Sequence, residues 1–169
     1  MGRMPHARAL ALLVAGLVAI GCSDEGDRGD AVAAPEEETV SQDVGERPET
    51  SGLIPADTDP PTALVVEDVA VGDGPAAADG DRLAVDYVGV RWSDGGEFDA
   101  SWERGQPIEF VLGAGRVIPG WEQGLEGMQV GGRRIITIPP ELAYGDRGAG
   151  AAIGPGETLV FVVDLVAIG

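Results

Sequence analysis

Lysine, histidine and cysteine, the residue types behind much nucleophilic and metal chemistry, are almost missing from this chain of 169 residues. Lysine does not occur, the only histidine is His6 and the only cysteine is Cys22. Both lie in or beside an N-terminal segment typical of a processing signal, so the rest of the chain has no Ser-His or Cys-His pair, no histidine metal ligand and no disulfide. We therefore expect no metal and no cofactor. Carboxylates, hydroxyls, arginines and apolar surface remain for function.

Two other chemistries can be weighed from local spacing. Glu97 and Asp99 form a carboxylate pair, but residues two apart on a strand share one face, and no other residue supports the sugar cleft of a glycosidase. Residues 113–115 (Gly-Ala-Gly) are followed by no lysine and by no helix with a free N-terminus. This glycine pair therefore predicts a turn and not a phosphate-binding loop.

The elements that must position any site lie in residues 63–169, which hold every Trp, Tyr and Phe. Period-two patterns predict strands at 64–66, 82–92, 107–112, 130–139 and 158–168. The last of these is apolar on both faces, which places it in the middle of the sheet. Trp121, Leu125 and Met128, behind Pro119, predict one short amphipathic helix over 119–128. One helix and several antiparallel strands indicate an α+β domain with the sheet wrapped on the helix.

The N-terminal residues indicate export. Residues 9–20 form an apolar run of twelve, too short for a bilayer-spanning helix but suited to a secretory signal. The run ends at Gly21-Cys22, which resembles a bacterial lipoprotein box, with Ala19 where that box usually has Leu. Residues 1–21 are thus expected to be a lipoprotein-type signal peptide, and Cys22 the lipidated residue of a membrane-anchored, extracytoplasmic protein. An ordinary signal peptide with an incidental cysteine is the alternative.

The segment between the signal and the domain is strongly acidic. Residues 22–62 contain twelve acidic residues against Arg28 and Arg47 and no aromatic residue, a composition that predicts a disordered acidic tether. The whole chain carries a formal net charge of -18. Such a charge excludes nucleic-acid binding through a basic surface.

Five stretches of the domain, taken in order, resemble the FKBP-type peptidyl-prolyl cis-trans isomerases. The resemblance covers essentially all of residues 64–169. It is carried by VDYVG at 85–89, FDAS at 98–101, VIPGWEQGL at 117–125, IPPELAYG at 138–145 and LVF at 159–161.

The resemblance implies a half-barrel of five or six antiparallel strands around one helix, with an apolar pocket for a proline side chain. It implies Trp121 as the pocket floor and, as walls or contacts, Tyr87, Phe98, Ile108, Val117, Ile118, Ile153 and Phe161. Asp99 and Tyr144 would be polar groups at the rim, with the Tyr144 hydroxyl donating to the peptide and Arg104 orienting Asp99. Without the family frame, these aromatic residues would more often be core than site.

The departures from the family are Ile108, in place of an aromatic wall residue, and Ala149 and Ala152, in place of larger side chains. They predict a more open pocket on that side.

The implied activity is rotation about Xaa-Pro bonds in unfolded or exported polypeptides, which needs no nucleophile because no bond is broken. Macrolides are implied as further ligands. A monomer is expected, since no dimerisation part is visible. The alternatives are a non-catalytic peptide-binding chaperone that uses the same cleft and a surface lipoprotein recognised by a partner.

Overall fold

The computed structural model describes residues 45–169. The expected signal peptide (1–21), Cys22 and most of the expected tether lie outside the described residues. In the described part, no helix is long and apolar enough to cross a membrane.

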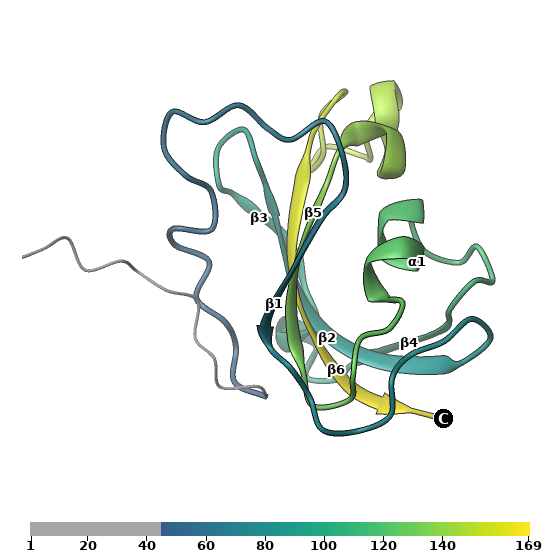
Figure 1. The fold of residues 1–169 in the computed structure, drawn as a ribbon. Coiled ribbons are helices and arrows are strands. Elements are labelled where there is room, and N and C mark those ends of the chain that lie inside the picture. The colour runs from purple at the N-terminus through teal and green to yellow at the C-terminus, as the bar shows by residue number, and fades with distance from the viewer. Residues whose placement is uncertain (1–44) are drawn as a thin grey trace, which may run out of the picture. The chain divides into compact units, whose positions relative to one another are not determined.

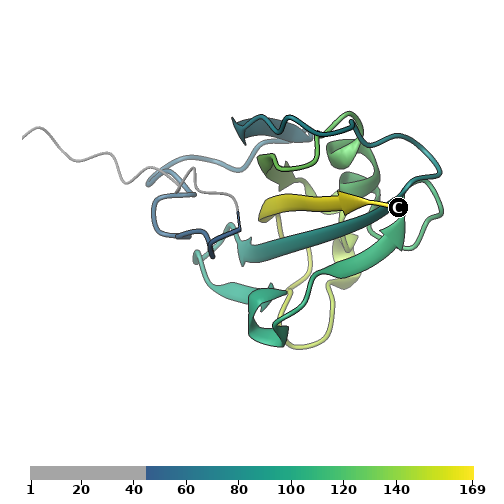
Figure 2. The same cartoon turned by 90° about the horizontal axis from the view of Figure 1, so that it is seen from below.

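Six antiparallel strands form one sheet that wraps around a short helix (Figure 1). The strands are β1 (Val65–Ala70), β2 (Arg82–Arg91), β3 (Glu97–Ala100), β4 (Ile108–Val111), β5 (Arg133–Ile138) and β6 (Leu159–Ile168). Their order is β1-β5-β6-β2-β3, and β4 pairs with β2 as well. The fold is therefore the expected α+β half-barrel, and β6 lies in the middle of the sheet as predicted from its two apolar faces (Figure 2).

Strand β3 was not among the predicted strands. It pairs with β2 through residues 88–90, whereas β4 pairs with β2 through residues 82–85. The 3-10 helix Trp102–Arg104 lies between β3 and β4 in the sequence. Tyr87 consequently lies on β2 between the two pairing regions, where side chains from the β3–β4 connection can reach it.

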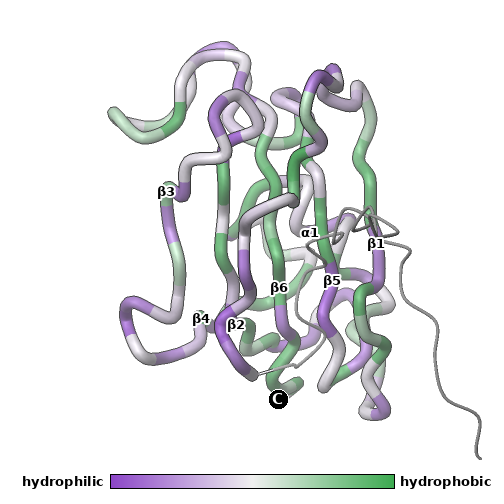
Figure 3. Tube along the Cα trace, turned by 90° about the vertical axis from the view of Figure 1, so that its left-hand side faces the viewer, coloured by the Kyte–Doolittle hydropathy of each residue, from purple (hydrophilic) through white to green (hydrophobic). Residues whose placement is uncertain are grey.

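The inner face of the sheet packs against α1 (Pro119–Leu125). Alternate residues of β2 and β6 supply this core, as predicted: Leu83, Val85, Tyr87, Phe161, Val163 and Leu165 are all buried. The helix contributes Trp121 and Leu125 to this core. It ends at Leu125 and not at Met128 as predicted, but Met128 is still buried in the same core. Hydrophobic residues run along β2, β5 and β6, in keeping with their central positions (Figure 3).

The outer face of the sheet carries a second apolar cluster, formed by Val88, Val90, Ala100 and Val160. Leu53 and Ile54 pack against it, together with Trp92, Trp102 and Ile135. Residues 45–62, called the covering segment below, lie on the face opposite α1 (Figure 1). The packed region thus includes residues that the sequence assigns to the tether, because an apolar outer face is stabilised when it is removed from water.

Candidate functional site

An open cavity of about 450 Å³ lies beside the N-terminal end of α1. Its walls come from β2, β4, the loop before α1 and the loop after β5. The lining residues are Tyr87, Ile108, Arg116, Val117, Ile118, Pro119, Trp121 and Tyr144. Six of the residues predicted from the sequence therefore meet at one cavity, and Arg116 and Pro119 were not predicted there.

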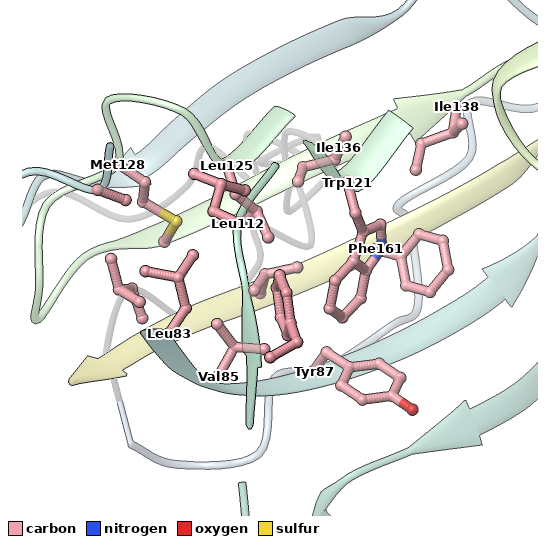
Figure 4. Close-up of a cluster of buried hydrophobic side chains, with 14 of the residues drawn as sticks. Leu83, Val85, Tyr87, Leu112, Trp121, Leu125, Met128, Ile136, Ile138 and Phe161 are labelled. Carbon is pink, nitrogen blue, oxygen red and sulfur yellow. The ribbon is translucent and has the colours of Figure 1, made fainter. Parts of the chain in front are cut away.

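Trp121 is held at this cavity by a cluster of aromatic rings. Its side chain is 4% exposed and lies edge-on to both Tyr87 and Phe161, with ring centroids 5.1 and 5.2 Å away (Figure 4). Phe110 adds a tilted contact at 5.8 Å, which sequence reasoning missed because strand alternation marks Phe110 only as core. Such edge-to-face pairs favour one ring orientation, so the floor of the cavity is rigid.

The indole nitrogen of Trp121 is buried and has no hydrogen-bond partner within residues 45–169. It lies on the side of the ring that faces Phe161 (Figure 4). The floor of the cavity is therefore an aromatic surface in which the only polar atom is turned toward another ring.

Three other predicted residues support the cavity without lining it. Phe98 lies edge-on to Phe161 at 5.5 Å, and Phe161 is buried behind Trp121. Ile153 is 6% exposed in the core and pairs by its backbone with Ala149. These three residues therefore belong to the packing around the cavity and not to its lining.

Tyr87, Asp99 and Arg104 form one hydrogen-bonded cluster at the cavity wall. The Tyr87 hydroxyl donates to one oxygen of Asp99 and accepts a hydrogen bond of 2.8 Å from Arg104. Arg104 also donates to the other oxygen of Asp99 at 2.6 Å, and its guanidinium carbon lies 5.5 Å from the Tyr87 ring centroid. Arg104 therefore holds both Asp99 and the Tyr87 hydroxyl by hydrogen bonds.

The electrostatics of the cluster hold each group in one protonation state. Burial, and then the hydrogen bond to Asp99, raise the pKa of Tyr87 to about 12. Partial burial acts to raise the pKa of Asp99, but the hydrogen bonds from Tyr87 and Arg104 prevail, and this pKa lies below its ordinary value. At neutral pH, Tyr87 is therefore neutral and Asp99 is ionised.

Ser101 positions this cluster, a role that the sequence did not reveal. Its side chain is buried, accepts a hydrogen bond of 2.9 Å from the Tyr87 backbone N–H and donates to Asp86 at 2.6 Å. Its own backbone N–H donates to the Tyr87 carbonyl at 2.9 Å. Ser101 thereby ties the residues after β3 to β2 at the point where Tyr87 lies.

Tyr144 differs from Tyr87 in having a free hydroxyl. Its side chain is 42% exposed, and within the described residues the hydroxyl makes no hydrogen bond. Tyr144 lies between the 3-10 helices Pro140–Leu142 and Gly145–Arg147, which follow β5. It is therefore the hydroxyl at this cavity that can donate to a bound molecule.

Comparison with known proteins agrees with this arrangement. Residues 74–166 match the family model described as FKBP-type peptidyl-prolyl cis-trans isomerase. The chain is 60% identical over 111 residues to an FK506-binding protein of Streptomyces anulatus, a match that covers 65% of this chain and 90% of that protein. It is 50% identical over 106 residues to a probable FK506-binding protein of Corynebacterium glutamicum, covering 63% of this chain and 87% of the relative.

Solved structures show the same fold. AtFKBP13 matches with a TM-score of 0.60 and 40% identity, over 65% of this chain and 96% of that one. FkpA from Escherichia coli matches with a TM-score of 0.58 and 46% identity, over 63% of this chain and 48% of that one. With the family model covering more than half of its length, the chain belongs to the FKBP-type peptidyl-prolyl cis-trans isomerases.

Proposed function

We propose that the chain accelerates rotation about Xaa-Pro bonds by binding the proline ring in the cavity on Trp121 while the Tyr144 hydroxyl donates to the bound peptide. The observation that carries this proposal is the open, mostly apolar cavity with a rigid aromatic floor and one available hydroxyl. A proline ring is a compact apolar group that such a surface removes from water.

The reaction itself explains why this cavity is sufficient. Rotation about the peptide bond must cross a barrier of about 18–20 kcal/mol because amide resonance is lost in the twisted state. Uncatalysed, this step takes tens to hundreds of seconds. No covalent bond is made or broken, so the catalyst has only to bind the twisted amide more tightly than the planar one.

Two properties of the site favour the twisted amide. The twisted amide separates less charge than the planar one, so apolar walls such as Ile108, Val117 and Ile118 penalise the planar ground state. The Tyr144 hydroxyl then holds a carbonyl of the peptide in place. The Tyr87 hydroxyl does not compete for this role, because its proton is already donated to Asp99.

The experiment that tests this mechanism compares two tyrosine-to-phenylalanine variants of the full chain. Exchange between cis and trans forms of a Leu-Pro peptide is followed by NMR, without a coupling protease. We expect Tyr144→Phe to lower kcat/KM by about 2- to 12-fold, the value of one hydrogen bond of about 0.5–1.5 kcal/mol. An unchanged rate in Tyr144→Phe would contradict the proposed donor.

The matched control is Tyr87→Phe, which removes a hydroxyl from the same cavity. Because that hydroxyl belongs to the Asp99–Arg104 cluster, its loss acts on the wall of the cavity and on folding stability, which thermal unfolding measures. Client refolding that persists in Tyr144→Phe despite lost turnover would instead favour a peptide-binding chaperone.

The names of the relatives suggest a second class of ligand for the same cavity. We propose that FK506-type macrolides bind on Trp121 and compete with the proline peptide. Ile108 offers less apolar area than an aromatic residue would, so the affinity should rise in Ile108→Phe. A competition titration against the NMR exchange assay measures both affinities.

We further propose that the chain acts as a lipid-anchored monomer outside the cytoplasm, on exported polypeptides. This proposal rests on the sequence of residues 1–22, with Cys22 as the acylated residue. Cys22→Ser should shift the protein from the membrane fraction to the soluble fraction and abolish incorporation of labelled fatty acid. Equal membrane association of both forms would contradict the anchor, and light scattering tests the monomer.

A further inference from the structure

One arginine at the cavity forms no ion pair within residues 45–169. Most arginines of the described part form an ion pair with a carboxylate, namely Arg47, Arg82, Arg91, Arg104, Arg133 and Arg134. Within residues 45–169, only Arg116 and Arg147 have no such pair. The chain has a net charge of -18, so carboxylates are plentiful, yet this arginine beside the cavity pairs with none of the described ones. It is available to bind a negatively charged ligand.

Among the residues that the structure describes, Arg116 is the only charged one that lines the cavity. The other lining residues are apolar or aromatic, and the nearby carboxylate of Asp99 is already paired with Arg104. A peptide bound at this cavity therefore meets one uncompensated positive charge at its edge.

The loop that carries Arg116 is held in one position. Glu122, in the first turn of α1, accepts hydrogen bonds from the backbone N–H groups of Gly113 and Gly115. Both glycines have positive φ, 77° and 65°, which lets the chain turn sharply there. Glu122 is thus engaged by the backbone, makes no ion pair with Arg116 and fixes the point from which the Arg116 side chain extends.

Building on the proline-binding function proposed above, we propose that Arg116 selects substrates with a carboxylate on a residue next to the proline. The guanidinium would bind that carboxylate while the proline ring lies on Trp121. An arginine suits this task, because its planar donors match the two oxygens of a carboxylate. The substrate class is then an acidic Xaa-Pro or Pro-Xaa segment of an unfolded chain.

The test uses the full chain and two pairs of peptides. In one pair, Glu or Gln precedes the proline, and in the other, Glu or Gln follows it. For each pair, NMR exchange gives the ratio of kcat/KM for the Glu peptide to that for the Gln peptide. Because both values of a ratio are measured with the same enzyme form, a general loss of activity in that form does not change the ratio. At low ionic strength we expect a ratio above one in one pair, by about two- to fivefold, as for an exposed ion pair.

Substitutions then assign the ratio to Arg116. In Arg116→Gln the ratio falls to about one, and in Arg116→Glu it falls below one. About 1 M salt should reduce the wild-type ratio as well, because the screening length is then about 3 Å. Arg147→Gln is the matched control: Arg147 is also exposed and unpaired among the described residues but does not line the cavity, so its loss should leave the ratio unchanged.

Three outcomes would overturn the inference. A wild-type ratio of one for both peptide pairs would show that the charge is not recognised. A ratio that survives in Arg116→Gln would assign selectivity to another group, and an equal fall in Arg147→Gln would assign it to overall charge. Absence of activity on every peptide would instead count against the isomerase function, so the two failures are distinguishable.

Discussion

Tyr87 and Tyr144 show how two identical side chains at one cavity acquire different tasks. The Tyr87 hydroxyl lies between a carboxylate and a guanidinium, which use both its donor and its acceptor capacity. The Tyr144 hydroxyl is left to the solvent or to a ligand. Hydrogen-bond partners, and not residue type, therefore decide which tyrosine is available to a substrate.

The cluster of Tyr87, Asp99 and Arg104 predicts that its contribution to activity does not vary from pH 5 to pH 8. Asp99 has a lowered pKa, so the stability it contributes is present above its unfolded value of about 3.9 and is lost as the pH falls through the folded pKa. Tyr87 has a raised pKa, so its contribution is present below about 10 and is lost as the pH rises through about 12.

NMR exchange at pH 5, 6.5 and 8 measures this directly. The expected kcat/KM is constant, and Asp99→Asn should lower it at all three values by weakening the hydrogen bonds that hold Tyr87 at the cavity wall. A step in activity within this window that disappears in Asp99→Asn would show that Asp99 titrates there and would contradict the assignment.

Much of the site could be predicted from the sequence, because the residues that line the cavity come from elements with clear patterns. Trp121 lies in the first turn of a helix marked by Pro119, and Tyr87 lies on a strand with regular alternation. Arg116 could not be found in this way, since an exposed arginine in a glycine turn has no periodicity. Ser101 was equally invisible, because only the packing of β3 against β2 gives its hydroxyl two partners.

At the scale of elements, helix α1 is placed by two glycines. A Cβ at Gly120 would lie 2.3 Å from Cγ2 of Ile138, and one at Gly124 would lie 2.8 Å from Cγ2 of Ile136. Both glycines weaken the helix intrinsically, which the sequence already indicates. The structure supplies the reason: these positions face β5 so closely that no side chain fits.

Gly120→Ala should consequently destabilise the fold although alanine favours helices. The gain in helix propensity is about 1 kcal/mol, and overpacking against Ile138 costs about 1–3 kcal/mol. We expect a net loss of up to about 2 kcal/mol in urea unfolding and a lower kcat/KM, because Trp121 moves with the helix. The exposed Gln123→Ala on the same helix should stay within about 0.5 kcal/mol. Greater stability of Gly120→Ala than of wild type would mean that overpacking against Ile138 costs less than the gain in helix propensity.

The strands show where a period-two pattern is informative and where it is not. Long strands such as β2 and β6 were predicted within a residue or two. Strand β3 has four residues, none of them placed by a clear alternation, and it exists because β2 offers it a partner. Pairing between segments distant in the sequence leaves no local signal.

At the scale of the whole molecule, the covering segment is hydrogen-bonded to a buried ion pair between β5 and β6. Arg133 donates to both oxygens of Asp164 at 2.6 and 2.7 Å, and both side chains are at most 1% exposed. Gly45 donates its N–H to Asp164 at 2.8 Å, and the Glu46 carbonyl accepts from Arg133 at 2.6 Å. The composition of residues 22–62 could not predict these contacts, because they are made by the backbone groups of Gly45 and Glu46 and not by side chains.

Asp164→Ala should therefore destabilise the protein by about 3–5 kcal/mol, since it leaves the Arg133 charge buried without its carboxylate. Chemical denaturation measures the loss. Glu109→Ala removes an acidic partner of an arginine at the surface, where both side chains are 61% exposed, and should cost less than about 1 kcal/mol. Similar losses in the two variants would show that the buried pair contributes no more than a surface pair.

The central position of β6 also sets the order in which the molecule can assemble. This strand follows all others in the sequence, yet β2 and β5 pair with it along most of its length. Until β6 has been synthesised, β2 and β5 lack the strand that pairs with both of them, and the sheet lacks its central strand. Contacts between segments so far apart in the chain form slowly. The sheet therefore cannot close until β6 has been synthesised, so the assembly of the whole domain depends on a strand that its pairing partners precede in the sequence.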